Sequence, residues 1–396
     1  MLLPALSPKE TNRMENAVFI QQFEQLFGTK PTVLSTSPGR VNIIGEHTDY
    51  NDGFVLPAAL QFTTQILCAK RSDDIINARS VQYEGELESF NLSQMLTPGS
   101  LAWGNYLRAV VNEFKAANLS LGGCDLLITS NVPQGSGLSS SAALEVAFGG
   151  LLNHIFNNGL NEQQIALIGQ AAENNFIDCQ CGIMDQLISA KAKDHHAILI
   201  DCKDLSTRAV HIPENLALVV INSNYPRKLA DSEYNQRRKA CELAASTMQV
   251  GKLREANMNM LDAVKNQLDD VTYRRAKHII TENKRVLDAA NAMENGNLTA
   301  LYSIMQLAHL SLKNDFEITV AATDGLVDIC NAALNGKGAA RQTGGGFGGA
   351  VVCLCDLDDV ETVILAVNKE YEARYSLHAD IYVCEASEGL QVVDLP

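Results

Sequence analysis

The sequence predicts a protein of two domains in which helices and strands are mixed, of the α/β or α+β class. Its 396 residues exceed the ~150 of an average domain. Short apolar runs of strand length alternate with longer amphipathic segments in both halves of the chain. The first half is richer in strands, whereas residues 205 to about 314 have mainly helical patterns. We therefore expect an N-terminal domain over residues 1–204 and a C-terminal domain over residues 205–396.

The individual elements follow from local patterns. The first helix is expected to begin at Ser7, because a Ser before Pro8 with Glu10 three residues later is typical of a helix start, and to end at Gly28. Strand-like runs follow at Thr63–Ala69, Cys124–Thr129, Ala197–Asp201, Leu216–Ile221, Gly349–Leu354 and Asp380–Cys384. Helical periodicity covers Ala142–Phe156, Glu162–Ile177, Ser232–Met248 and Val271–Ala292.

Charge and cysteine content restrict the partners and the compartment. The chain has 31 Lys and Arg against 46 Asp and Glu, a net charge of −15, which argues against a general binder of nucleic acid or of anionic membranes. No run reaches the ~18 apolar residues of a membrane span, and the first ten residues lack the basic region of a signal peptide. The ten cysteines, including the pair Cys179 and Cys181, are interpreted as reduced thiols. We expect a cytoplasmic protein.

A glycine- and serine-rich segment, Gly135 to Ser141, joins an apolar strand to a helix. Glycines allow the backbone to approach a ligand closely, and a helix N-terminus offers unpaired N–H donors, so the segment predicts an anion cradle. It lacks the Gly-Lys-Ser/Thr ending of a P-loop and the spacing of a dinucleotide-binding fingerprint. The alternative interpretation is an ordinary helix N-cap.

Two further segments suggest a binding site. Five glycines in six residues follow Arg341, directly before an apolar strand, which favours close backbone approach to a ligand over a flexible linker. The segment Pro38 to Gly53 gathers polar side chains whose donors and acceptors suit the hydroxyls of a sugar. These side chains are Arg40, Glu46, His47, Asp49 and Asn51. A solvated turn and a metal site are the alternatives, and the helix-borne spacing of a zinc site is missing.

These three segments together resemble the three motifs of the GHMP kinases. GRVNIIGEHTDYNDG is similar to the galactokinase signature of that superfamily in particular, and AENNFIDCQCGIMDQ, INSNYPRKLADSEYNQRR and SLKNDFEIT match as well. The matches extend from Pro38 to Ala350. The resemblance implies an α+β fold with an N-terminal α/β domain of ribosomal-protein-S5-like topology and a C-terminal ferredoxin-like α+β domain. It places the active site in the cleft between them.

The resemblance also implies an activity, transfer of the γ-phosphoryl group of ATP to the anomeric hydroxyl of α-D-galactose, with Mg²⁺ as cofactor. By motif position, Asp185 corresponds to the catalytic base and Arg40 to the residue that stabilises charge in the transition state. Sugar contacts correspond to Glu46, His47, Thr48, Asp49, Gly182 and Tyr234. The phosphate loop corresponds to Gly135, Ser136, Gly137, Leu138, Ser139, Ser140 and Ser141, and the Mg²⁺ ligands to Ser141 and Glu173, while Gly345 and Gly346 line the cleft.

Four other expectations concern single positions. Asp185 follows Glu173 by twelve residues, beyond the end of the expected helix, and is placed on a loop that faces the cleft. Trp103 is interpreted as core or helix-end packing, with adenine stacking as the alternative. The adjacent histidines 195–196 predict a surface turn, and the basic run 237–239 a solvated helix face.

Two rival functions remain open from the sequence. One is a kinase for a related sugar, such as N-acetylgalactosamine or arabinose, because the residues between the motifs set the shape of the sugar pocket. The other is a sensor that binds galactose and ATP without turnover. The complete phosphate loop and Asp185 favour an enzyme. The expected partners are galactose and MgATP, with no nucleic acid and no membrane, and we expect a monomer.

Overall fold

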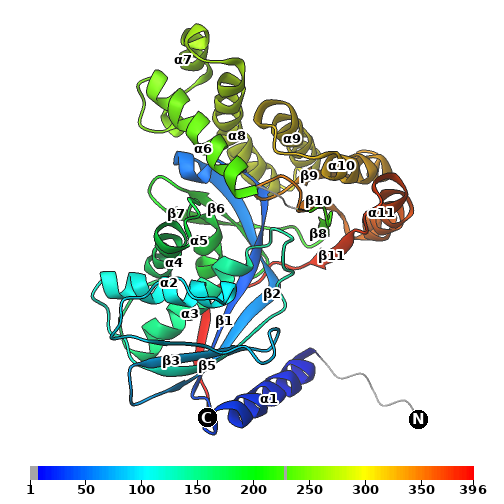
Figure 1. Ribbon diagram of the computed structural model, residues 1–396. Helices are drawn as coiled ribbons and strands as arrows, with labels where there is room; N and C mark the ends of the chain where they lie inside the picture. The colour runs from blue at the N-terminus through cyan, green and yellow to red at the C-terminus, as the bar shows by residue number, and fades with distance from the viewer. Residues whose placement is uncertain (1–7, 227–229) are drawn as a thin grey trace, which may run out of the picture.

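The computed structural model describes residues 8–226 and 230–396 and contains two β-sheets, each in its own lobe (Figure 1). The first sheet has the strand order β12-β1-β2-β5-β3-β4, and β6 pairs with both β2 and β7. All its pairs are antiparallel except β3 with β5. Its strands are β1 (Val33–Ile44), β2 (Phe54–Lys70), β3 (Ile75–Ser80), β4 (Glu88–Asn91), β5 (Cys124–Ser130), β6 (His196–Asp201), β7 (Ser206–His211) and β12 (Gln391–Asp394).

The second sheet is antiparallel throughout and has the order β11-β8-β10-β9. Its strands are β8 (Leu216–Asn222), β9 (Gly338–Gln342), β10 (Ala350–Asp356) and β11 (Asp380–Cys384). Helices connect β8 to β9, and one helix connects β10 to β11, so the chain follows the β-α-β-β-α-β order of ferredoxin-like units.

Helices cover both sheets. In the first lobe, α2 and α3 pack on the face that carries Ile66 and Leu126, whereas Phe19 and Phe23 of α1 pack on the opposite face, against Leu67. This division follows from the alternation of side chains along β2 and β5. The helices are α1 (Pro8–Phe27), α2 (Ala102–Ala116), α3 (Ser140–Ile155), α4 (Glu162–Ala172), α5 (Met184–Lys191), α6 (Ala230–Thr247), α7 (Met258–Ala263), α8 (Asp270–Glu294), α9 (Leu298–Ser311), α10 (Ala321–Leu334) and α11 (Val360–Tyr375).

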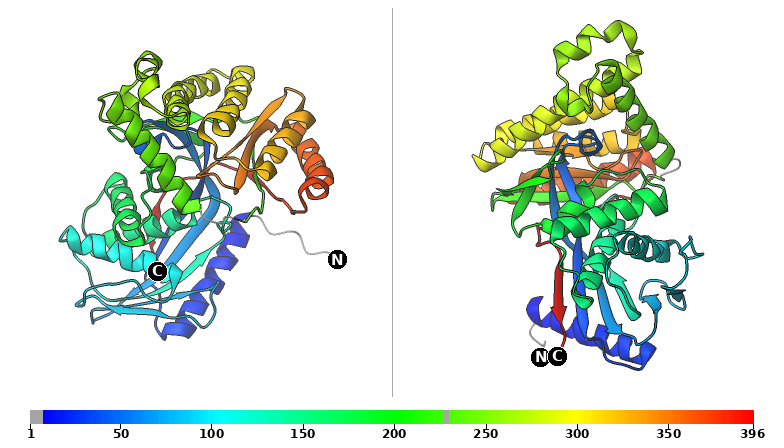
Figure 2. Two further views of the ribbon diagram at one scale, coloured as in Figure 1. Left: turned by 45° about the horizontal axis from the view of Figure 1, so that its top comes forward. Right: turned by 90° about the vertical axis from the view of Figure 1, so that its left-hand side faces the viewer.

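A hydrophobic core joins the two lobes. Val41 of β1 and Leu56 of β2 belong to the same buried cluster as Leu218 and Val352 of the second sheet and Met305 of α9. The chain also returns to the first lobe at its end, where β12 pairs with β1 (Figure 2). Burial of this shared core fixes the orientation of the two lobes, and with it the shape of any site between them.

The α+β fold class is confirmed, and each predicted strand and helix is found. β2 is longer than the expected run, and the expected helix to Ile177 ends in a π-helical turn. Helix α1 ends before Gly28, whose φ is 69°, as expected, while Ser7 lies outside the described residues. The division at residue 204 stays a prediction, although β7 and β12 lie beyond it and belong to the first sheet.

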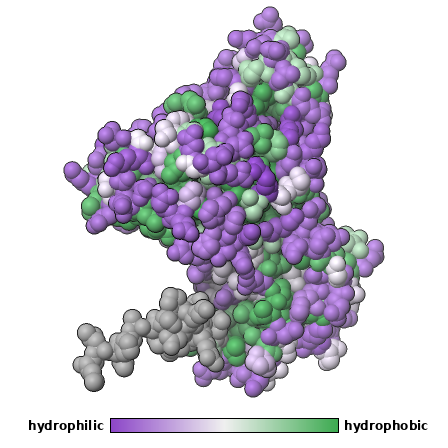
Figure 3. Space-filling model, turned by 180° about the vertical axis from the view of Figure 1, so that it is seen from behind, coloured by the Kyte–Doolittle hydropathy of each residue, from purple (hydrophilic) through white to green (hydrophobic). Residues whose placement is uncertain are grey.

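The surface is mainly hydrophilic on the face seen in Figure 3, where apolar side chains are scattered over the upper lobe but gather in one area of the lower lobe, and an indentation separates the lobes. In the described ranges, no helix has the length and apolar character that crossing a membrane requires.

Candidate active site

Arg40 lies on β1 beside a break in the pairing of that strand with β2. The register shifts between Pro38 and Arg40, and a Cβ atom at Gly39 would lie 2.7 Å from the carbonyl oxygen of Leu138. The backbone N–H of Arg40 donates to that same oxygen at 3.0 Å. Bulges often redirect side chains beside active sites. At this bulge, the glycine-serine segment therefore packs directly against β1.

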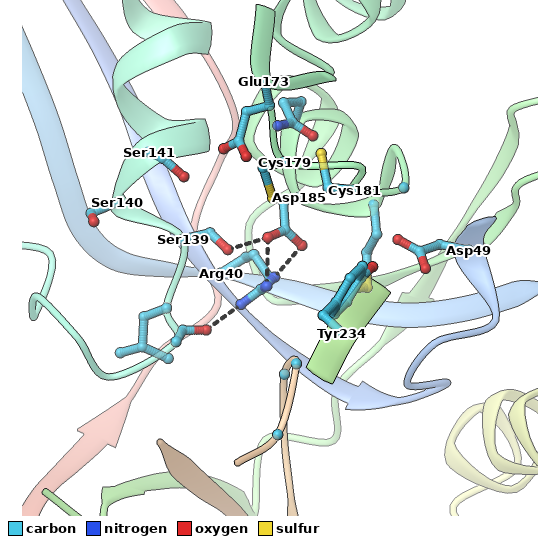
Figure 4. A pocket seen from close by; sticks show the side chains of 18 of the residues that line it. Arg40, Asp49, Ser139, Ser140, Ser141, Glu173, Cys179, Cys181, Asp185 and Tyr234 are labelled. Carbon is cyan, nitrogen blue, oxygen red and sulfur yellow. Dashed lines mark hydrogen bonds and ion pairs between the residues drawn. The ribbon is translucent and has the colours of Figure 1, made fainter. Parts of the chain in front are cut away.

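Arg40 and Asp185 form a bidentate ion pair at the centre of the site (Figure 4). Nε and Nη2 of Arg40 donate to the two carboxylate oxygens of Asp185 at 2.7 and 2.6 Å, and Nη1 donates to the carbonyl oxygen of Gly137 at 2.5 Å. The hydroxyl of Ser139 donates to Asp185 Oδ2. Asp185 lies in the first turn of α5, so its expected placement on a loop is wrong. A helix holds the carboxylate more rigidly than a loop would.

The glycine-serine segment forms the connection from β5 to α3. Gly135, Gly137 and Ser139 have φ angles of 71°, 81° and 60°, so the chain there is in the left-handed region, which glycine tolerates best. Ser139 is the N-cap of α3 but makes no capping hydrogen bond, because its hydroxyl is directed to Asp185. Ser136 is buried and donates to the carbonyl oxygen of Pro133. The other six positions, 135 and 137–141, line the cavity described below.

Glu173 begins the π-helical turn η2 (Glu173–Ile177), directly after α4. Its side chain is buried and faces the same space as the hydroxyl of Ser141 (Figure 4). Behind it, Glu145 accepts from Gln186 at 3.0 Å through Oε2, while Oε1 is buried without a hydrogen-bond partner. Burial and the nearby Glu173 raise the pKa of Glu145 well above its usual range. Carboxylate and hydroxyl oxygens are the ligands that Mg²⁺ prefers, so this set fits a magnesium ion.

Asp49 and Tyr234 lie on the other side of the ion pair (Figure 4), and Gly182 lies against Asp49 in the same cavity lining. A Cβ atom at Gly182 would lie 2.8 Å from Cβ of Asp49 and still closer to its carboxyl group, so only glycine fits there. Burial, together with the charge of Asp185, raises the pKa of Asp49 to about 6. Tyr234, on α6, packs its ring against His47 with the ring centres 4.9 Å apart.

Glu46 joins the first polar segment, residues 38–53, to the glycine-rich third segment, residues 344–349. Its Oε2 forms a buried ion pair with Arg341 of β9, and its Oε1 accepts from the backbone N–H of Gly344 at 3.3 Å. Arg341 also donates to the carbonyl oxygen of Ile43 at 2.8 Å. A buried carboxylate needs such a partner, because desolvation otherwise disfavours its charged form. The pair therefore holds the two segments together at the base of the cleft.

His47 and Thr48 lie outside the cavity lining and bond to the segments that form it. His47 has a φ of 64°, and its ring nitrogens contact the hydroxyl of Tyr50 at 2.9 Å and the carbonyl oxygen of Gly345 at 3.3 Å. Burial lowers the pKa of His47 to about 3, so the imidazole is neutral at pH 7. The Thr48 hydroxyl is within hydrogen-bond distance of the carbonyl oxygens of Gly45 and Phe54. Neither residue is among those that line the cavity.

The cavity between the lobes has a volume of about 320 Å³, and the third segment closes one side through Gly344, Gly345 and Gly346. Its lining carries one guanidinium, that of Arg40, against five carboxyl groups. These five are Glu46, Asp49, Glu173, Asp178 and Asp185. An acidic lining of this kind repels a polyanionic ligand unless a divalent cation accompanies it.

A second cavity of about 320 Å³ adjoins the first at Gly135, Ser140 and Ser141. Trp103 and Tyr83 line it with parallel rings whose centres are 6.4 Å apart. Trp103 near the start of α2 also donates from Nε1 to Glu86 at 2.6 Å. Trp103 therefore packs at a helix end, as expected, and also lines a cavity of apolar and polar character next to the glycine-serine segment.

Sequence reasoning missed or misread several residues. Arg341 and Asp178 had no predicted role, although Arg341 lies three residues before Gly344, the first of the clustered glycines, and this was the available signal. The solvated face expected at 237–239 is wrong at Arg237, which is buried, bonds to the carbonyl oxygen of Glu317 at 2.7 Å and lies over the ring of Phe347. Arg237 thereby packs against the third segment at Phe347. The surface turn expected at 195–196 is found at His195, whose φ is 57°, whereas His196 is already the first residue of β6.

Three models of known protein families match successive parts of the chain. A model described as the galactokinase galactose-binding signature matches residues 21–70, the GHMP kinase N-terminal domain matches 105–193 and the GHMP kinase C-terminal domain matches 289–373. The structure of Lactococcus lactis galactokinase complexed with galactose is similar at a TM-score of 0.90 and 32% identity, covering 95% of this chain and 99% of that one. Methanococcus jannaschii mevalonate kinase has a TM-score of 0.64 at 19% identity, covering 90% and 99%. The structure of homoserine kinase from Cytophaga hutchinsonii has a TM-score of 0.61 at 14% sequence identity, and the match covers 92% of this chain and 98% of that one.

The two-lobed fold with its phosphate-loop segment is thus that of the GHMP kinases, and the chain is a kinase of this class. Within that class, the chain belongs to the galactokinase family.

Proposed function

We propose that this protein transfers the γ-phosphoryl group of ATP to the anomeric hydroxyl of α-D-galactose, giving galactose 1-phosphate and ADP. The observation that carries the proposal is the Arg40–Asp185 ion pair, which lies between the phosphate-loop segment on one side and Asp49 and Tyr234 on the other. This arrangement provides a base and a cation at the junction of a phosphate site and a polyol site.

On the nucleotide side, the phosphates of ATP lie at the N-terminus of α3, where unpaired backbone N–H groups and the helix dipole favour anions. The nucleoside extends into the second cavity, where Trp103 and Tyr83 offer aromatic surface for the adenine. Ser141 and Glu173 would hold Mg²⁺, which neutralises charge on the phosphates. The excess of carboxyl groups in the cavity supports the proposal that ATP binding depends on a divalent cation.

On the sugar side, ionised Asp49 accepts hydrogen bonds from sugar hydroxyls, and Tyr234 supplies an apolar surface and a phenol. Glu46 and His47 act here mainly by fixing the third segment through Arg341, Gly344 and Gly345. Thr48 fixes the loop that carries Asp49.

In the transfer itself, the oxygen of the anomeric hydroxyl attacks the γ-phosphorus while the bond to the ADP oxygen breaks. The hydroxyl proton passes to the carboxylate of Asp185, and Arg40 stabilises the charge that develops on the transferred group. Both oxygens of Asp185 already bind Arg40, and Ser139 binds one of them, so the carboxylate is held in place before the sugar arrives. Phosphoryl transfer depends mainly on such positioning and charge stabilisation.

We also propose a cytoplasmic location, supported by ten free cysteines, because disulfides are rare in reducing compartments. The monomeric state stays an expectation.

The test of the proposed function is a coupled ADP-release assay over a panel of sugars, with the product of the best substrate identified by ³¹P NMR. We expect the highest kcat/KM with galactose and a sugar 1-phosphate as product. A higher kcat/KM with arabinose or N-acetylgalactosamine would contradict the proposed specificity. Galactose binding by calorimetry without ADP release would identify a sensor instead.

A further inference from the structure

Two thiols lie beside the carboxylate of Glu173 on the wall of the active-site cavity. The Sγ atoms of Cys179 and Cys181 and a carboxylate oxygen of Glu173 all lie within 4.8 Å of one another. All three residues line the cavity, and both cysteines are partly exposed (Figure 4). The phosphoryl transfer described above uses neither thiol.

The backbone brings these three groups together. The π-helical turn η2 ends at Asp178, whose φ of 66° reverses the chain. The N–H groups of Asp178 and Cys179 both donate to the carbonyl oxygen of Glu173, and the N–H of Cys181 donates to the carbonyl oxygen of Cys179 at 2.8 Å. Cys181 Sγ is further held 3.7 Å from Oδ1 of Asn174. These bonds fold residues 179–181 back over Glu173.

We propose that Cys179, Cys181 and Glu173 bind one Zn²⁺ ion. On binding, each thiol releases its proton to solvent and becomes a thiolate ligand, the carboxylate gives the third ligand, and a water from the cavity takes the fourth position. Zn–S bonds of ~2.3 Å and Zn–O bonds of ~2.1 Å in a tetrahedron separate ligand atoms by about 3.4–3.8 Å. The three ligand atoms therefore need to approach one another by no more than about 1.2 Å, which small rotations of the side chains provide.

Zinc binding has a consequence for catalysis that rests on the proposed function. Glu173 is the carboxylate proposed for Mg²⁺, and a hard oxygen site with added thiolates selects the softer Zn²⁺. The ion would draw the carboxylate away from Ser141. Zn²⁺ is therefore expected to inhibit the kinase in competition with MgATP, and a chelator is expected to restore activity.

Cadmium titration tests the site without reference to activity. The reduced protein is titrated with Cd²⁺, and thiolate-to-cadmium charge-transfer absorption in the ultraviolet is recorded for the wild type, Cys179→Ser and Cys181→Ser. Cys384→Ser is the control, because that thiol, on β11, is not among the residues that line the active-site cavity. We expect one Cd²⁺ bound through two thiolates, at least about tenfold weaker binding in each of the first two variants, and no change in the control. Thermal melting without metal confirms that the variants fold.

Equal titrations of the wild type and the Cys179→Ser and Cys181→Ser variants would overturn the proposed site. Zinc inhibition is then compared with each variant's own rate in the absence of zinc, and the variants should need at least about tenfold more Zn²⁺. Stoichiometric cadmium binding without zinc inhibition would contradict the sharing of Glu173 between the two metals. If no sugar kinase activity is found, the cadmium titration still shows whether the two thiols bind metal. Failure of the proposed function can therefore be told apart from failure of the proposed metal site.

Discussion

A methyl group at position 182 tests how tightly the sugar side of the site is positioned. In Gly182→Ala the new Cβ would lie 2.8 Å from Cβ of Asp49, and closer to its carboxyl group. Carbon atoms pack at about 3.5–4.0 Å, so Asp49 must retreat by at least about 0.7 Å at Cβ and by more at the carboxylate. A misplacement of about 1 Å in a reacting site can reduce the rate about 100-fold, which corresponds to about 2.7 kcal/mol in kcat/KM.

The assay measures kcat/KM for galactose and KM for ATP in the same enzyme preparations. We expect about a 100-fold loss in kcat/KM for galactose with KM for ATP nearly unchanged, because Asp49 lies across the Arg40–Asp185 ion pair from Ser139, Ser140 and Ser141. Gly251→Ala is the control, since the nearest atoms to its Cβ would be 3.7 Å away. A Gly182→Ala enzyme with the kcat/KM of the wild type would refute the positioning argument, and equal losses for both substrates would place the effect elsewhere.

Three further results are expected. Ser141→Ala and Glu173→Gln should each raise KM for MgATP at least about tenfold while calorimetric galactose binding is retained, and an unchanged KM would remove both from the proposed metal site. Arg341→Met should lower the free energy of unfolding in urea by about 3–5 kcal/mol, because it leaves buried Glu46 without its ion-pair partner. Adding Glu46→Gln should recover part of that loss, and no recovery would contradict the assignment. Because the pKa of Asp49 is raised to about 6, its carboxylate becomes protonated as the pH falls through 6, so KM for galactose should rise below that pH. Asp49→Asn should have a flat profile between pH 5 and 7, and a rise like that of the wild type would show that another group titrates.

Much of the fold could be predicted because apolar periodicity reports burial. The runs at Leu216–Ile221 and Gly349–Leu354 are buried on both faces as β8 and β10. β1 was missed because its sequence, with Pro38 and Gly39 at a bulge, lacks a regular pattern. The pairing of β12 with β1 could not be predicted, since local patterns carry no information about contacts between residues so far apart in the chain.

The residues of the site could be predicted where sequence motifs mark them. They were harder to predict where contacts between distant parts of the chain determine the position of a side chain. Arg40, Asp185 and the segment 135–141 were located by motif, and the structure brings them together. The helical position of Asp185 was misread because α5 is short and begins only one residue earlier, at Met184. The burial of Arg237 was missed because its guanidinium lies over the ring of Phe347, over 100 residues further along the chain.

Galactose-dependent ADP release, measured with Mg²⁺ in the wild type and in Asp185→Asn side by side, tests the central claim most directly. We expect turnover in the wild type and a loss of about 10²- to 10⁴-fold in the variant, with galactose binding still measurable by calorimetry. Near wild-type rates in Asp185→Asn would contradict the assignment of the base. Absence of ADP release by the wild type at millimolar galactose would contradict the proposed reaction itself.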